Sequence, residues 1–314
     1  MHPALSVIFF TVASGMGYGL MFWAAIGALA GASPRPLLAG VALGIVCATA
    51  GLLSSLGHLG KPARAWRAFS QWRTSWLSRE GVAAVATYVP ALALGAALLP
   101  GMVSGDAAGT PAVLGPGGRV AAVALALLAL ATVGCTAMIY ASLPPIPAWR
   151  HRLVVPGYLL FALFTGGLAT AFLHAALAAT PHVGALPLLA GALALALLKH
   201  RYWRDLREPL PVQRGDAVGL PGRTVGVFER PHTEGNFVTR EMVFVLARRH
   251  ADRLRRIALV LFALVPALCA LSLALPHVEA TWPLAVASLS ALAGAFVERW
   301  LFFAQARHLV SLYY

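Results

Sequence analysis

The sequence predicts an all-α, polytopic integral membrane protein with eight transmembrane helices in a bundle. Of its 314 residues, 59% are hydrophobic and only 11% are charged, whereas a soluble domain carries roughly 25% charged residues. Apolar runs long enough to cross a bilayer alternate with shorter basic segments. A chain with so few charged groups cannot cover a surface that faces water, so lipid is its expected solvent.

We expect eight spans of about 20 residues each, the length that crosses the hydrocarbon core. The run between His151 and Lys199 is too long for one helix, and the turn signal Thr180-Pro181-His182 divides it in two. The first run is longer than the apolar part of a cleavable signal peptide, and no positive segment precedes it. The expected spans are Ala4–Ala30, Leu37–Gly57, Gly81–Leu99, Val120–Ala141, Leu153–Ala178, Val183–Leu198, Ile257–Leu275 and Trp282–Phe303.

The whole chain, 1–314, is expected to form a single membrane domain with two unusual segments. Residues 60–79 are predicted to be an interfacial amphipathic loop, because Trp66, Phe69, Trp72, Trp76 and Leu77 share one face of a helical projection. Residues 200–256 are predicted to be a basic extramembrane loop, since they are charged and interrupted by four prolines. The second segment is the only sizeable part expected outside the membrane.

Positive charge lies almost entirely on one side of this topology. The side that carries both termini holds 22 Lys and Arg residues and the other side holds 2. Positively charged loops stay in the cytoplasm, so we expect both termini in the cytoplasm of a bacterium, with the chain in its inner membrane. The net charge of +13 then reflects orientation and contact with anionic lipid or partner surfaces, and not nucleic-acid binding.

The three cysteines do not indicate a metal centre. Cys47, Cys135 and Cys269 lie in separate apolar runs, and the chain has no CxxC motif. An iron–sulfur cluster held by thiolates alone is therefore excluded. Each cysteine is expected to be a small buried hydrophobe.

The stretch Leu56–Glu80 places ionisable groups next to bilayer hydrocarbon, where they are costly and often functional. A quinone head group is an apolar ring with two carbonyl acceptors, and its reduction takes up two protons. His58, at the end of the second span, is suited to donate a hydrogen bond and exchange a proton. Glu80, at the expected start of the third span, is suited to carry protons to water, and Arg64 to order it through a charge-assisted bond.

Plainer interpretations of the same residues remain open. The stretch is also typical of a positive-inside loop with an aromatic belt. Glu298 lies near the end of the last span on the same side, where an ion pair with its neighbour Arg299 would anchor the helix. A b-type haem needs two histidines at similar depth, and no expected span holds a central histidine, which disfavours haem.

Several motifs resemble the membrane anchor subunits of DMSO-reductase-type molybdoenzymes, within the wider polysulfide-reductase-like group. They are the opening MHPALSVIFFTVASGMGYGL, HLGKPARAWRA followed by SWLSRE, IYASLPPIPAW, and the final FVERWLFF. They are spread over nearly the whole chain. The segment PHTEGNFVTREM at 231–242 is similar to anchors of cytoplasm-facing sulfite dehydrogenases.

The resemblance implies a quinone-binding anchor, a non-molybdenum subunit that contributes the quinone-reactive site of an oxidoreductase complex. His58, Arg64 and Glu80 match motif positions associated with quinone in that family. Its expected partners are an iron–sulfur electron-transfer subunit, a molybdopterin catalytic subunit and membrane lipid. The expected ligand is menaquinone or ubiquinone, reduced here, with no haem, metal or iron–sulfur cluster in this chain.

Further candidates for contact with the quinone come from position. Trp66 lies in the expected lid, and Tyr140 and Glu298 lie on the same side of the membrane as His58. The alternatives from other functional classes are a secondary transporter, a b-type haem membrane subunit and a passive scaffold. A transporter is disfavoured because no pair of spans combines a Gly/Pro break with a central charge.

A C-terminal alkaline phosphatase fusion is expected to be inactive, because the distribution of cations places the C-terminus in the cytoplasm, where the enzyme's disulfides do not form. A fusion within the loop Gly101–Gly118, on the opposite side, is the matched control and should be active. The reverse pattern of activities would invert the predicted topology.

Overall fold

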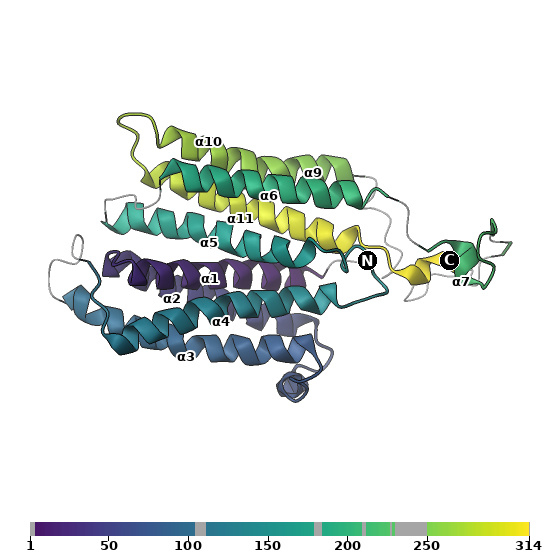
Figure 1. Ribbon diagram of the computed structural model, residues 1–314, viewed down its shortest axis with the longest axis horizontal. Helices are drawn as coiled ribbons and strands as arrows, with labels where there is room; N and C mark the ends of the chain where they lie inside the picture. Colours follow the sequence, from purple (N-terminus) through teal and green to yellow (C-terminus); the bar gives the residue numbers. More distant parts are fainter. Residues whose placement is uncertain are drawn as a thin grey trace.

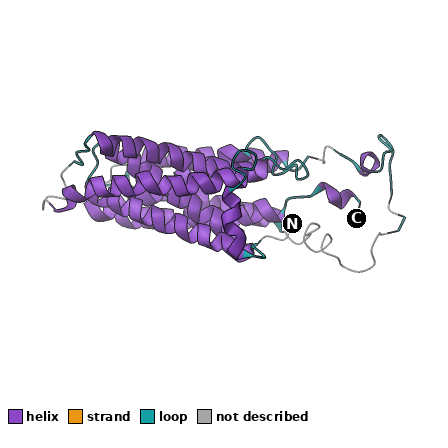
Figure 2. Ribbon diagram, turned by 90° about the horizontal axis from the view of Figure 1, so that it is seen from below, coloured by secondary structure: helices purple, strands orange, loops and turns teal. Residues whose placement is uncertain are grey.

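The computed structural model describes residues 4–103, 111–178, 184–208, 212–226, 228–229 and 250–313. Within those ranges every regular element is a helix (Figure 2). The long helices are α1 (Leu5–Leu29), α2 (Pro34–Ser55), α3 (Trp76–Val103), α4 (Pro116–Ala141), α5 (Val154–Ala178), α6 (Ala185–Asp205) and α11 (Thr281–Ala304). The shorter elements are η1 (Leu56–His58), η2 (Pro62–Phe69), α7 (Arg214–Ala217), α9 (Ala251–Leu259), η4 (Val260–Leu264), α10 (Val265–Ser272) and η5 (Leu309–Leu312).

The long helices lie side by side in one bundle (Figure 1). α1 is central, because it packs on α2, α4, α5 and α11. α3 packs on α4 at one side of the bundle, and α6, α9 and α10 gather around α11 at the other (Figure 1). The start of α1 and the end of α11 lie at the same end of the bundle (Figure 1), which also carries the start of α3 with Glu80 and is called the basic end below.

Seven segments of the described chain are long and apolar enough to cross a membrane. They comprise α1, α2, α3 as far as Gly101, α4, α5, the continuous segment Ala251–Ser272, and α11. This finding supports a multi-pass membrane protein, but the predicted eight spans are not confirmed. The remaining long helix, α6, continues past the expected end at Leu198 into Lys199, His200 and Arg201, and these residues lower its mean hydropathy.

The structure corrects the predicted amphipathic segment. α3 begins at Trp76, five residues before the expected start at Gly81, and the preceding loop forms only the short 3-10 helix η2. Trp76 and Leu77 therefore belong to the first turn of α3, so the predicted single helical arc from Trp66 to Leu77 is wrong. Trp66, Phe69 and Trp72 are exposed, as expected for side chains that face lipid head groups.

The seventh predicted span, Ile257–Leu275, is built from α9, η4 and α10. η4 is a π-helical turn directly before Val265 and Pro266. Proline lacks the N–H for an internal helical bond and its ring collides with the carbonyl four residues earlier. A single π-helical turn accommodates that defect, so the span continues without ending at the proline.

Much of the predicted basic loop, 200–256, lies outside the described residues, including the segment 231–242 that carries the similarity to sulfite dehydrogenase anchors. The described part shows that α6 extends to Asp205 and that α7 forms at Arg214–Ala217. α9 begins at Ala251. The loop is therefore shorter than predicted at both of its ends.

Glycines allow α1 to approach its neighbours backbone to backbone. A Cβ atom added at Gly19 would lie 1.9 Å from the carbonyl oxygen of Ala162 on α5, and one at Gly166 would lie 2.3 Å from the backbone of Gly19. On the other face, a Cβ at Gly17 would lie 2.6 Å from the carbonyl oxygen of Gly44 on α2. Small residues at such contacts are typical of helix packing in membranes, and here they fix the central position of α1.

Gly19→Ala is expected to destabilise the bundle by at least about 1–3 kcal/mol, the usual cost of overpacking, because the backbone of α5 cannot give way to a methyl group. Gly134→Ala on α4 is the control, since a Cβ there has no neighbour within 4 Å. Thermal unfolding of the purified protein in detergent measures both. Equal stability of the two variants would contradict the close contact between α1 and α5.

Candidate functional site

Four ionisable side chains lie buried inside the basic end of the bundle. Because burying a charge costs free energy unless it is paired, their partners indicate what this region does. Their residues have exposed fractions between 1% and 4%: Glu80 on α3, Lys199 on α6, and Glu298 and Arg299 on α11.

Glu80 lies in the second turn of α3 and faces α4. The hydroxyl of Thr136 donates to its Oε1 across 2.5 Å. One turn deeper on α4 lies Thr132, whose hydroxyl oxygen is 3.2 Å from the hydroxyl oxygen of Thr87 on α3. The expectation that Glu80 sits at the water boundary is wrong, because α3 begins earlier than predicted. Glu80 is instead the outermost member of a buried line of side-chain oxygens.

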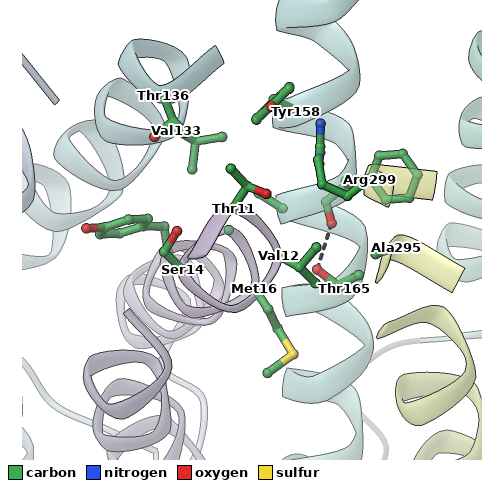
Figure 3. Close-up of a pocket in the computed structure, with 14 residues that line it drawn as sticks. Thr11, Val12, Ser14, Met16, Val133, Thr136, Tyr158, Thr165, Ala295 and Arg299 are labelled. Atoms are coloured by element: carbon green, nitrogen blue, oxygen red, sulfur yellow. Dashed lines mark hydrogen bonds between the residues drawn. The ribbon is translucent and has the colours of Figure 1, made fainter. Parts of the chain in front are cut away.

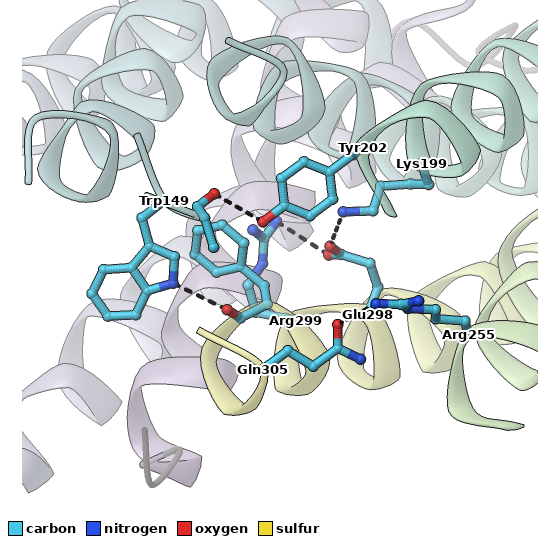
Figure 4. Close-up of polar contacts among 9 residues, drawn as sticks. Trp149, Lys199, Tyr202, Arg255, Glu298, Arg299 and Gln305 are labelled. Atoms are coloured by element: carbon cyan, nitrogen blue, oxygen red, sulfur yellow. Dashed lines mark hydrogen bonds and ion pairs between the residues drawn. The ribbon is translucent and has the colours of Figure 1, made fainter. Parts of the chain in front are cut away.

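Glu298 belongs to a second buried cluster, drawn in Figure 4. Its Oε1 accepts from Lys199 Nζ across 2.5 Å, whereas Arg299 Nη2 lies 3.9 Å from its Oε2. The guanidinium of Arg299 stacks over the ring of Tyr158 at 3.6 Å, and Lys199 Nζ lies 4.0 Å from the ring centroid of Tyr202. The main partner of Glu298 is therefore a lysine from another helix, and not its neighbour Arg299.

Tyr140 lies one turn after Thr136 on α4, within a cluster of aromatic rings. Its ring centroid is 5.3 Å from that of Trp149, 6.0 Å from Tyr158 and 5.2 Å from Phe303. The indole of Trp149 donates to the carbonyl oxygen of Phe302 across 3.0 Å. These aromatic rings form an apolar boundary to the buried polar groups on the side that faces the α4–α5 loop.

His151 in that loop marks the border with water. Its Nε2 lies 3.2 Å from Asp205 Oδ2, and its ring lies edge-on to that of Tyr202. Partial burial lowers the pKa of His151, and the carboxylate of Asp205 opposes this shift. A titratable imidazole thus lies beside the buried cluster.

Two small cavities lie among the buried polar groups. The first, of about 20 Å³, lies between α1, α4, α5 and α11 and is bordered by Thr11, Ser14, Thr136, Tyr158 and Arg299 (Figure 3). The second, of about 10 Å³, is bordered by Lys199, Glu298 and Arg299. A water molecule needs a cavity of at least about 10–15 Å³. The first cavity therefore has room for about one water molecule, and neither cavity admits an aromatic ring.

The remaining predicted site residues lie in the loop between α2 and α3. His58 ends η1, and its side chain lies outside the described part of the structure. Arg64 and Trp66 are exposed on η2, and among the described ion pairs none joins Arg64 to Glu80. η2 nevertheless lies close to Glu80, because the ring of Phe69 packs 3.3 Å from a Cβ placed at Gly81.

Sequence reasoning missed Lys199, Thr136 and Tyr158. Lys199 ends a long uncharged run, which is why the sequence places it at the edge of the extramembrane loop. Glu298 could have pointed to Lys199, since an acid within an apolar span requires a buried cation as its partner. Nothing in the sequence distinguishes Thr136 from Thr132, the other threonine of α4.

Metal ligands do not cluster in the part of the chain that the structure describes. No three His, Cys, Asp or Glu side chains there come close enough to hold an ion. The three cysteines are free and lie on different helices.

Comparison with known proteins identifies the family. Residues 1–305 match the family described as "DMSO reductase anchor subunit (DmsC)". The chain is also 34% identical to a sulfite dehydrogenase subunit from Allochromatium vinosum, over 100% of this chain and 99% of the relative. The match covers the predicted motifs and the helices that carry the buried polar groups. The chain therefore belongs to the DmsC family of membrane anchor subunits.

Proposed function

We propose that this anchor binds a quinone at the basic end of the bundle and exchanges electrons between an iron–sulfur subunit and the quinone pool. The observation that carries the proposal is Glu80, a buried carboxyl group that is hydrogen-bonded to Thr136 and has no cation among its described partners. Such a group can take up or release a proton without breaking an ion pair. Proton exchange at the membrane edge is what quinone reduction requires.

The residues around Glu80 fit a quinone head group. Its carbonyl oxygens need hydrogen-bond donors and its ring needs apolar walls. η1 ends in His58, and η2 carries the exposed Trp66 and places the aromatic ring of Phe69 next to the start of α3. Because the cavities are too small for the ring, the head group would lie between this loop and Glu80, at the rim of the bundle.

We further propose that the complex contains a molybdopterin catalytic subunit and that electrons flow toward quinone. The membership in the DmsC family and the relative from a sulfite dehydrogenase support this assignment. Sulfite is the substrate that the relative's name indicates for such a catalytic partner. The exposed cations of η2 and α6 lie at the end of the bundle where a partner would meet the quinone.

His58→Ala is expected to lower quinone-linked turnover by roughly 10²-fold or more, the scale of a positioned acid–base group. Reduction of a soluble dye by the assembled complex should continue, because it bypasses the quinone. His277→Asn is the control at the opposite end, since His277 has a φ of 68°, which asparagine tolerates. Normal quinone kinetics in His58→Ala would place the site elsewhere.

Glu80→Gln is expected to slow quinone-linked turnover and to alter its pH dependence, since the amide keeps the shape of the side chain but does not exchange protons. Turnover is measured from about pH 5 to 9, a range in which catalytic acids and bases titrate, in membranes that hold the complex. Glu279→Gln, an exposed carboxylate in the loop before α11, is the control and should keep the original profile. An unchanged profile in Glu80→Gln would exclude proton exchange by this residue.

A further inference from the structure

The buried polar groups continue from Glu80 across the bundle to the far side of α11. Thr136, the partner of Glu80, borders the first cavity (Figure 3). Arg299 and Tyr158 stand in the walls of both cavities, and Glu298 borders the second. The two clusters of buried acids are thus joined through two cavities whose walls carry these polar groups together with apolar side chains such as Phe161. This connection is called the polar seam below.

Several buried polar atoms along this seam have no hydrogen-bond partner of good geometry among the described residues. They are the hydroxyl groups of Tyr18 and Tyr158, Nε of Arg299 and Oε2 of Glu298. Buried polar atoms are costly to leave unpaired, and ordered water is their usual partner. The first cavity has room for one water molecule and the second is at the lower limit.

The seam reaches solvent beside α9. Lys199 and Arg255 lie over the ring of Trp203, at 5.2 and 5.9 Å from its centroid. Arg255 donates to Gln305 across 3.0 Å and to Asp252 across 3.1 Å. The carboxylate of Asp252 is 70% exposed, so this chain of contacts ends in water at the basic end.

We propose that this seam is a proton relay that connects Glu80 to water near Asp252, through the Thr136 hydroxyl, water in the first cavity, the Tyr158 hydroxyl and water in the second cavity beside the Lys199–Glu298 pair. The proposal rests on the proposed quinone site. Arg299 positions the cavity water and does not carry the proton itself, because a guanidinium stays protonated and can donate hydrogen bonds but not accept them. Lys199 and Glu298 fix Arg299 in place.

The proton balance is simple. Reduction of one quinone to quinol consumes two electrons, delivered by the iron–sulfur subunit, and two protons. Glu80 gives one proton to a quinone oxygen, and the relay returns a proton to Glu80 from the water at Asp252. His58 supplies the other proton from the loop side. No proton crosses the membrane in this scheme, since both routes start at the basic end.

Two nearly isosteric variants test the relay in membranes that hold the whole complex. Thr136→Val removes the hydroxyl group beside Glu80, and Tyr158→Phe keeps the ring under Arg299 but removes its hydroxyl group. The ratio of quinone-linked to dye-linked turnover is measured in H₂O and in D₂O. We expect each variant to lower the ratio about tenfold or more, since proton transfer by positioned groups contributes at least this much, and to enlarge the solvent isotope effect.

Thr170→Val is the matched control. Thr170 is buried on α5 and donates to the carbonyl oxygen of Gly166 across 2.9 Å, but it borders neither cavity. The control should keep both the ratio and the isotope effect. Two results would overturn the relay: an unchanged ratio in Thr136→Val and Tyr158→Phe, or a lowered ratio with an unchanged isotope effect.

A second measurement distinguishes a defect in the relay from a defect in the quinone site. It is the binding affinity of the complex for a fluorescent hydroxyquinoline analogue of quinol. If the relay is correct, Thr136→Val and Tyr158→Phe bind the analogue as the unmodified complex does. If His58→Ala and Glu80→Gln lose quinone turnover while the two relay variants do not, only the relay fails. If none of the four variants affects quinone turnover, the proposed quinone site fails as well.

Discussion

The ion pair between Lys199 and Glu298 is the constraint on which the outer part of the bundle depends. Removing two charges from water costs several kcal/mol for each ion, and the 2.5 Å contact offsets this cost only while α6 and α11 remain together. The pair therefore explains why α6 stays in the bundle although its end is too polar for a clear span. It also sets the position of Arg299, whose guanidinium lies between Glu298 and the ring of Tyr158.

Glu80 is buried to a similar degree as Lys199 and Glu298, but in a different electrostatic setting. Glu298 has two cations within 4 Å, so protonating it would leave both without their partner. Glu80 has a threonine hydroxyl, which can donate to the carboxylate or accept from the carboxylic acid. One bundle thus holds an acid whose charge is fixed by its partners beside an acid that is free to change protonation. This division suits a site where one group carries protons and another holds its surroundings in place.

The class of protein, most helices and the loop with His58 could be predicted from the sequence, because hydropathy, cation placement and motif order are local signals. Lys199 could not, since a lysine that ends an apolar run looks the same whether it reaches water or a buried glutamate. Omitting the buried Lys199 and Arg299 leaves 20 cations on the predicted cytoplasmic side against 2, so the expected orientation survives this error. The depth of Glu80 was misjudged because the third span was counted from the apolar run that begins at Gly81. α3 begins at Trp76, directly after Ser75, a residue type preferred at helix N-termini, which a hydropathy criterion does not register.

The small size of the cavities restricts where each part of the proposed reaction takes place. A cavity of about 20 Å³ admits water but excludes a quinone ring. The close contacts of Gly17 and Gly19 hold α1 against α2 and α5, so the first cavity cannot widen by a movement of α1 away from α5. In the proposed reaction the ring would therefore stay at the rim beside η1 and η2, near the surface where an iron–sulfur partner would dock. Electrons would then travel a short distance from the partner, while protons would reach Glu80 through the interior of the bundle.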